Sequence, residues 1–157
     1  QSPMEDGMQH FHEFLRRELP RLHEMSERVA RVHGGHTPDM ATVFQVFNDM
    51  EEELNFHMMK EEQILFPAIS AMSTGKAAPQ PLDGPIDCMI HEHNDVGDAL
   101  TRLNALTGGY TPPPGACNTW RALYAGLAEL EEDLHRHIHL ENSVLFPAAR
   151  IMAAAEG

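Results

Sequence analysis

Two stretches of twelve residues share a pattern that could bind metal. HMMKEEQILFPA begins at His57 and HIHLENSVLFPA begins at His137, and both place a glutamate four residues after the histidine. Residues four apart lie one turn apart on the same face of an α-helix, so Glu61 accompanies His57 and Glu141 accompanies His137. Two such pairs from two helices can bring two carboxylates between two metal ions, each of which then takes histidine nitrogens on its outer side.

Apolar stripes place these pairs on helices. One stripe, with alternating spacings of three and four, includes Ile64 after Glu61, and another includes Val144 after Glu141. Four stripes predict four long amphipathic helices, over about residues 6–34, 38–72, 84–107 and 117–152. The chain is therefore expected to be all-α, an antiparallel up-down four-helix bundle formed by one domain over residues 1–157. Three prolines are expected to kink or end helices locally: Pro20, Pro67 and Pro147.

The two halves of the chain form an internal repeat. His57 and Glu61 correspond to His137 and Glu141 at an offset of 80, and His12 corresponds to His93 at an offset of 81. The bundle is accordingly expected to consist of two helical hairpins related by a pseudo-twofold axis.

Six polar residues stand on the stripes where a hydrophobic core should be. Burying an unpaired carboxylate or imidazole costs several kcal/mol, so groups at repeat-related core positions need compensation. A lone core histidine is more often a hydrogen-bonded structural residue, but six such groups together favour a metal cluster. Mixed imidazole and carboxylate ligation suits iron or manganese, with zinc as a frequent contaminant. The candidate ligands are His12, His57, Glu61, His93, His137 and Glu141.

Composition excludes several other classes of function. The 157 residues have a net charge of −13 and are 42% hydrophobic, which disfavours binding to nucleic acid or to an anionic membrane surface. No apolar run approaches the roughly 18 residues of a membrane span, and no signal peptide is visible. Two cysteines without a framework fit free thiols in a reducing, cytoplasmic setting.

The other polar candidates are weaker. His33 lies 21 residues from His12, roughly 31 Å along a helix, so it can join the site only if the helix breaks at Pro20. Glu53 and Asp133 stand one turn before His57 and His137. They are candidate acceptors for the second N–H of those histidines or part of a path for iron, and otherwise solvated acids. The remaining histidines are expected to be solvated and lie off the stripes: His10, His23, His36, His91, His135 and His139.

At these residues the sequence resembles the hemerythrin-like di-iron domains, and in particular the di-iron domain of the iron-centre repair (RIC) proteins. The stretches HMMKEEQILFP, HEHNDVG, PPPGACNTWRALY and HIHLENSVLFP show the resemblance, which extends from about His10 to Pro147. It implies two non-haem iron ions with Glu61 and Glu141 as bridges and an oxo or hydroxo bridge. The terminal ligands that it implies are His12, His57, His93 and His137, two for each iron.

The sequence also departs from these families. Oxygen-carrying hemerythrins have a further histidine one turn after the third-helix ligand, where this chain has Gly97, so open or labile iron positions are expected instead of simple oxygen carriage. Full-length repair proteins have an N-terminal domain with a cysteine pair, and such a domain is expected to be absent. Ferritin-like proteins use Glu-x-x-His and more carboxylates, which makes oxidase chemistry a poorer match.

The resemblance implies a role in the response to nitrosative and oxidative stress. The leading hypothesis is repair of damaged iron–sulfur clusters, with damaged or apo iron–sulfur proteins receiving the iron. Reduction of nitric oxide at the two irons is an enzymatic alternative, because two adjacent irons could hold two NO molecules close together. A module that binds, scavenges or senses NO or O2 is the third hypothesis.

Overall fold

The computed structural model describes residues 3–156, and residues 1, 2 and 157 of the expected domain lie outside that range. All regular elements in the described range are helical, which confirms the all-α prediction. The elements are α1 (Pro3–His33), α2 (Asp39–Lys60), η1 (Glu61–Leu65), α3 (Phe66–Ser73), α4 (Asp83–Leu106), α5 (Asn118–Leu140), η2 (Glu141–Leu145) and α6 (Phe146–Glu156). None of the helices in this range is long and apolar enough to cross a membrane.

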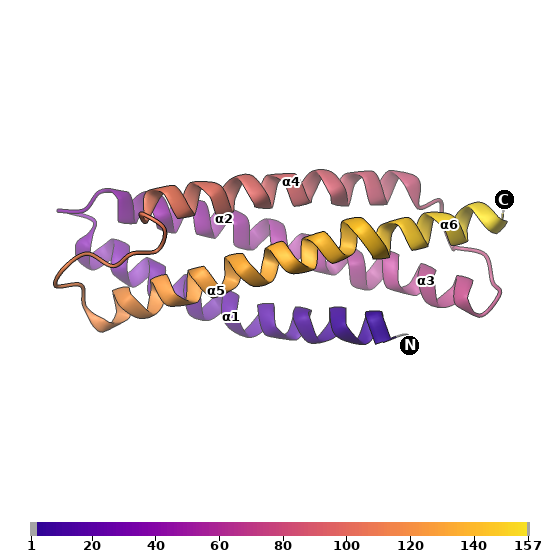
Figure 1. The fold of residues 1–157 in the computed structure, drawn as a ribbon, viewed down its shortest axis with the longest axis horizontal. Helices are drawn as coiled ribbons and strands as arrows, with labels where there is room; N and C mark the ends of the chain where they lie inside the picture. The colour runs from indigo at the N-terminus through magenta and orange to yellow at the C-terminus, as the bar shows by residue number, and fades with distance from the viewer. Residues whose placement is uncertain (1–2, 157) are drawn as a thin grey trace.

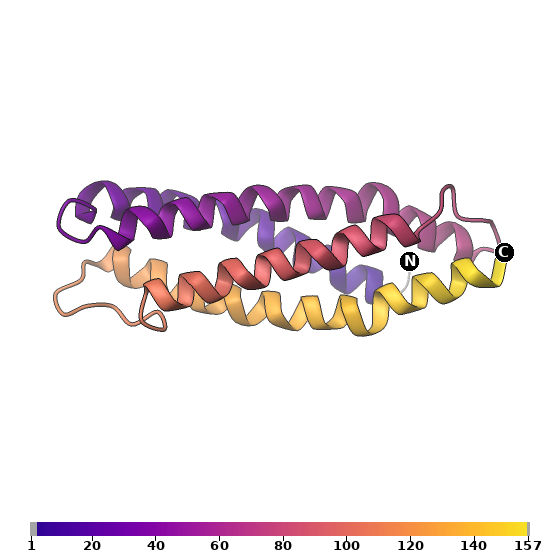
Figure 2. The ribbon, with the colours of Figure 1, turned by 90° about the horizontal axis from the view of Figure 1, so that it is seen from above.

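These elements form four long rods, because α2, η1 and α3 are continuous and so are α5, η2 and α6. Successive rods run in opposite directions, and α1 packs against α2 and α5 while α4 packs against α2 and α5 (Figures 1 and 2). Both termini lie toward the end that contains the connection between α3 and α4 (Figure 1). The predicted antiparallel up-down four-helix bundle is therefore confirmed.

Each of the two repeated dodecamers contains a π-helical turn. The N–H of Phe66 donates to the carbonyl of Glu61, and the N–H of Phe146 donates to that of Glu141, five residues back in each case. The next residue is Pro67 or Pro147, which has no N–H and would clash with the carbonyl four residues earlier in a regular helix. A wider turn lets the rod continue. The rods therefore do not end at Pro67 and Pro147, although the regular α-helix is interrupted just before each proline, and α1 continues through Pro20.

The π turns correct the predicted core register. Ile64 is only partly buried and Val144 is 43% exposed, although both were expected on the buried stripe. An extra residue in the turn rotates the following positions, so Leu65 and Phe66 are buried in the first dodecamer. Leu145 and Phe146 are buried in the second.

The apolar core has two parts with the six predicted polar residues between them. The larger cluster includes Leu15, Leu54, Val96 and Leu134 and extends toward the end where α1 joins α2. The smaller cluster lies nearer the termini and includes Leu65, Phe66, Leu145 and Phe146. A polar layer therefore crosses the bundle where each rod passes from one apolar cluster to the other.

Gly126 brings α5 close to α1. A β-carbon added at Gly126 would lie 2.6 Å from Cδ2 of Leu22, a side chain that is fully buried. Packed interiors have little room for such a shift. The two rods can approach this closely only because residue 126 has no side chain.

We expect Gly126→Val to destabilise the protein by about 2 kcal/mol, because the added carbons overpack the contact between α1 and α5. Urea unfolding of variant and parent in the same metal state measures the difference. Gly97→Ala is the matched control, since a β-carbon at Gly97 meets nothing within 4 Å. That variant should gain about 0.5–1 kcal/mol from helix propensity. Equal effects of the two substitutions would contradict the packing argument.

Candidate metal centre

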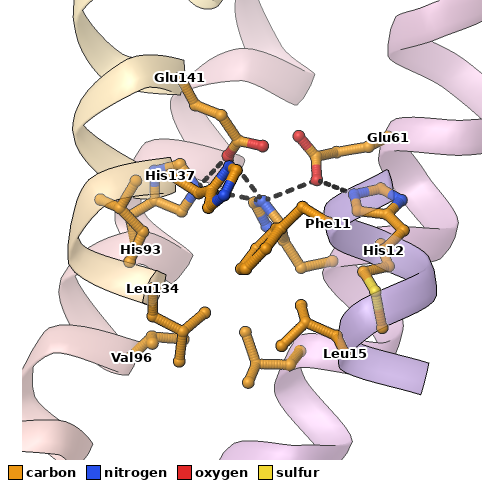
Figure 3. Close-up of a pocket in the computed structure, with 13 residues that line it drawn as sticks. Phe11, His12, Leu15, Glu61, His93, Val96, Leu134, His137 and Glu141 are labelled. Atoms are coloured by element: carbon orange, nitrogen blue, oxygen red, sulfur yellow. Dashed lines mark hydrogen bonds and ion pairs between the residues drawn. The ribbon is translucent and has the colours of Figure 1, made fainter. Parts of the chain in front are cut away.

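The six candidate ligands line one small cavity in the polar layer (Figure 3). Its volume is about 20 Å³. His12 comes from α1, His57 from α2, His93 from α4 and His137 from α5, while the two glutamates begin the π turns. Figure 3 shows Leu15, Val96 and Leu134 on the side of this layer opposite the carboxylates. Five of the six are at most 6% exposed, and His137 is partly buried.

The inner atoms of these side chains converge. Nε2 of His93 lies 2.7 Å from Oε1 of Glu141 and 3.1 Å from Nε2 of His57. Nε2 of His57 lies 3.5 Å from Oε1 of both glutamates, and Nε2 of His12 lies 3.1 Å from Oε1 of Glu61. Donor atoms of His57, His93 and Glu141 lie within 4.8 Å of one another, which is close enough to share one cation.

Acceptors on neighbouring helices fix the outer nitrogens of three of the histidines. Oxygen atoms in these positions can accept a hydrogen bond from Nδ1–H. The Nε2 atoms of the same rings face the cavity, where each can bind a metal ion through its lone pair. The three bonds are His12 Nδ1 to Glu62 Oε2 at 2.7 Å, His57 Nδ1 to Glu92 Oε1 at 2.9 Å and His93 Nδ1 to Asn142 Oδ1 at 2.8 Å.

Glu53 and Asp133 do not take the acceptor role that the sequence predicted. Asp133 is bonded to Arg136 on its own helix. Glu53 lines a separate cavity with Asp95, and burial followed by repulsion from Asp95 raises its pKa. A side chain one turn earlier points along the same face as the histidine, whereas the acceptor must approach the ring from another helix.

Cations hold two of the acceptors in turn. Arg16 binds Glu62 through two bonds of 2.7 Å, and its hydrogen bonds lower the pKa of Glu62 to about 2. Burial opposes ionisation of Glu92, but hydrogen bonds from His57 and Lys60 outweigh it and lower its pKa to about 2. Both acceptors are therefore ionised at neutral pH.

The two inner carboxylates have opposite shifts. Burial, with the neighbouring Glu141 charge, raises the pKa of Glu61 well above its usual value. Burial acts in the same direction on Glu141, but hydrogen bonds from Glu61, His57 and His93 outweigh it and lower its pKa. Two buried carboxylates this close cannot both ionise cheaply without a cation between them.

The donor set fits metal ions. Within residues 3–156, Glu61 Oε2 and His137 Nδ1 are buried side-chain atoms without a hydrogen-bond partner. The Nε2 atoms of His57 and His93 face each other at 3.1 Å, close enough for both to bind one cation. Burial also lowers the pKa of His12, so this imidazole stays neutral and able to bind.

His33 is far from this layer. Because α1 is continuous through Pro20, His33 lies at the other end of the bundle, with Nε2 3.7 Å from Cys117 Sγ and Nδ1 3.4 Å from His36 Nε2. It does not line the cavity. His23 was expected to be solvated, but its Nδ1 is 2.7 Å from Glu51 Oε1, which makes it a partly buried surface pair.

The sequence contains a signal for the missed acceptors. Glu62 and Asn142 each follow the inner glutamate directly, at equivalent positions of the two dodecamers, and Glu92 directly precedes His93. The repeat therefore marks these positions, but only the arrangement of the helices shows which histidine each one contacts.

We expect Glu62→Leu to weaken retention of bound Fe²⁺ about 10- to 100-fold, because His12 loses the acceptor that orients it. Equilibrium competition with a coloured ferrous chelator measures the change. Glu53→Leu is the control, since it removes a carboxylate from the same rod without touching the cavity. Equal loss in the two variants would mean that surface charge, and not the contact to His12, controls retention.

Comparisons with known proteins agree with this geometry. Residues 4–149 match the family described as the hemerythrin HHE cation binding domain. The iron–sulfur cluster repair protein YtfE of Musicola paradisiaca is 47% identical over 142 residues, which cover 90% of this chain and 62% of that relative. The protein of the same name from Edwardsiella ictaluri is 45% identical over 139 residues, covering 88% and 61%.

The matched region leaves part of each relative uncovered, so the chain spans a little over three fifths of the length of these curated relatives. The resemblance found in the sequence is nevertheless confirmed over nearly the whole chain. The chain belongs to the hemerythrin HHE cation-binding domain family.

Proposed function

We propose that the polar layer holds two non-haem iron ions and that the protein helps to repair iron–sulfur clusters by supplying iron. Glu61 and Glu141 lie between the two ions, and four histidines bind at the outer sides: His12, His57, His93 and His137. The observation that supports this most directly is that three histidines direct Nε2 into the cavity while acceptors on neighbouring helices contact their Nδ1 atoms.

This mixture of donors suits iron or manganese, and the match to the hemerythrin family favours iron. In ligand softness, four imidazoles with two carboxylates lie between the all-oxygen sites of Mg²⁺ and the thiolate sites of zinc. Bound iron would supply a transferable, redox-active ion. The protein's own part is to orient the imidazoles and to hold two buried carboxylates whose charges bound cations would neutralise together.

The repair role comes from the relatives. Curated proteins named for iron–sulfur cluster repair share 45–47% of their residues with this chain over the matched region. Because the chain spans only part of their length, their activity is a proposal for this protein. We propose damaged or apo iron–sulfur proteins as the recipients of the iron. Cys88 and Cys117 are free thiols, which fits the cytoplasmic setting that we propose.

Binding of NO or O2 is a second candidate. Among the described residues that line the cavity, six offer nitrogen or oxygen donors. Two iron ions in octahedral coordination need more donors than these six supply, so positions remain for a small ligand. This candidate covers both stoichiometric NO or O2 binding and reductive coupling of NO.

We expect Glu61→Leu to lose iron while the metal-free protein becomes more stable. The variant should retain at most one iron per chain where the parent retains two. The metal-free form should gain about 1–3 kcal/mol, because an apolar side chain replaces a buried carboxylate. Iron analysis and urea unfolding of the metal-free forms measure the two effects. A metal-free variant less stable than its parent would contradict the argument.

Iron transfer tests the repair role. The protein is loaded with iron, reduced without air and mixed with an apo iron–sulfur enzyme and a sulfide source. We expect that enzyme to regain activity faster than with an equal amount of free ferrous iron, because the bundle delivers iron in a bound form. Recovery of the recipient's activity over time is the measurement.

Two controls accompany this experiment. Glu61→Leu should give no advantage over free iron, whereas Glu53→Leu should behave as the parent does. Recovery no better than with free iron would contradict donation by this chain. Formation of nitrous oxide over several turnovers from NO, without air and with an excess of reductant to restore the diferrous state, would then favour reductive coupling of NO. Stoichiometric uptake without nitrous oxide would favour NO binding.

A further inference from the structure

Three of the four inner histidines have a hydrogen-bond acceptor at Nδ1, and His137 has none. Two of the three acceptors follow the internal repeat. Glu62 accepts from His12 and Asn142 accepts from His93. Positions 62 and 142 correspond at the offset of 80, and His12 and His93 correspond at 81. In each hairpin, therefore, the residue after the inner glutamate holds the histidine of the preceding rod.

The second pair of histidines departs from this rule. His57 has an acceptor, Glu92, which Lys60 also binds. By the repeat, position 92 corresponds to position 11 and position 60 corresponds to position 140, and these are Phe11 and Leu140. The charged pair that supports His57 is thus replaced by two apolar residues around its counterpart, His137.

Phe11 stands at the sequence position of the missing acceptor. Its ring stacks on the His137 imidazole with centroids 3.6 Å apart and planes 13° from parallel. Within residues 3–156, Nδ1 of His137 is buried and has no hydrogen-bond partner. Figure 3 shows Phe11 in the cavity lining beside these rings. A stacked ring restricts the imidazole, but it accepts no proton and adds no negative charge.

The contacts also divide the ligands into two groups. His57 and His93 contact each other and Glu141, and both have an outer acceptor, while Nε2 of His57 lies equally close to Glu61. His12 contacts Glu61 instead. With two histidines for each ion, His137 shares an ion with His12. One ion therefore has two supported imidazoles and the other has one.

We propose that Phe11 makes the ion at His12 and His137 the more weakly held of the two, and therefore the ion that leaves first. This inference rests on the proposed function and adds which iron is supplied. An acceptor on Nδ1–H fixes the ring and makes Nε2 a stronger donor to the metal. His137 has no such acceptor. Both histidines of the other ion, His57 and His93, have one, so that ion is released more slowly.

The order of release is tested on the full chain loaded with two ferrous ions, without air. An excess of a coloured ferrous chelator is added and its complex is followed over time. We expect two phases of equal amplitude, one ion each, with rates that differ about tenfold, the lower end of the effect of such outer partners. A single phase would overturn the inference.

Substitutions at position 11 test the role of Phe11. Phe11→Glu places an acceptor where the repeat has Glu92, and should slow the fast phase about tenfold while the slow phase is unchanged. Adding Leu140→Lys restores the counterpart of Lys60 and should slow it further. Phe11→Leu removes the stacked ring without adding an acceptor and should not slow release. Slowing by Phe11→Leu as much as by Phe11→Glu would overturn the inference.

The opposite change gives an independent measurement. Glu92→Leu removes the acceptor of His57 and should accelerate the slow phase until the two phases merge. His137→Ala should leave one iron that is released at the slow rate, and His57→Ala should leave one released at the fast rate. The reverse assignment would overturn the inference.

These outcomes separate the inference from the proposed function. Two irons that transfer to an apo enzyme but leave in one phase would refute the role of Phe11 and leave donation intact. Fewer than two irons on the parent chain would refute both.

Discussion

Burial of carboxylates and imidazoles between two apolar clusters is the constraint on which the rest of this structure depends. Five of the six inner residues are almost inaccessible to water, and a buried ionised group without a partner is very costly. The two glutamates respond with pKa shifts in opposite directions, because metal-free protein cannot keep both charged. Such a layer is a poor way to stabilise a bundle, which is why its presence points to a cation.

The surrounding fold keeps this costly layer in place. The apolar clusters on either side supply the hydrophobic free energy that the layer lacks. Each π turn begins at an inner glutamate, so the same local widening that accommodates Pro67 or Pro147 also sets where the carboxylate enters the cavity. π turns are commonly found at functional sites of helices. The repeated Leu-Phe-Pro thus belongs to the geometry of the centre as much as to the core.

Much of this arrangement could be predicted from the sequence, because it depends on contacts within single helices. A spacing of four places His57 with Glu61, and polar residues on apolar stripes indicate a metal site. Two kinds of feature could not be predicted in this way. The π turn changes the register by one residue, which moved Ile64 and Val144 out of the core. Acceptors such as Glu92 contact a histidine on another helix. Their partners therefore depend on which helices pack together and on the positions of those helices along the bundle axis.

The duplicated bundle shows how a symmetric sequence can build an unequal centre. Repetition gives each half the same inner histidine and glutamate residues, which is what two ions of the proposed kind would need. Positions that only support those ligands need not match: Glu62 has the neutral counterpart Asn142, and Glu92 has Phe11. A neutral amide still orients its histidine, but a phenyl ring removes the acceptor altogether. Differences at these supporting positions can make the two proposed ion sites unequal while the inner histidines and glutamates stay the same. A protein with the proposed iron-supplying role can separate firm binding and ready release between two ion positions, each of which takes ligands from both halves.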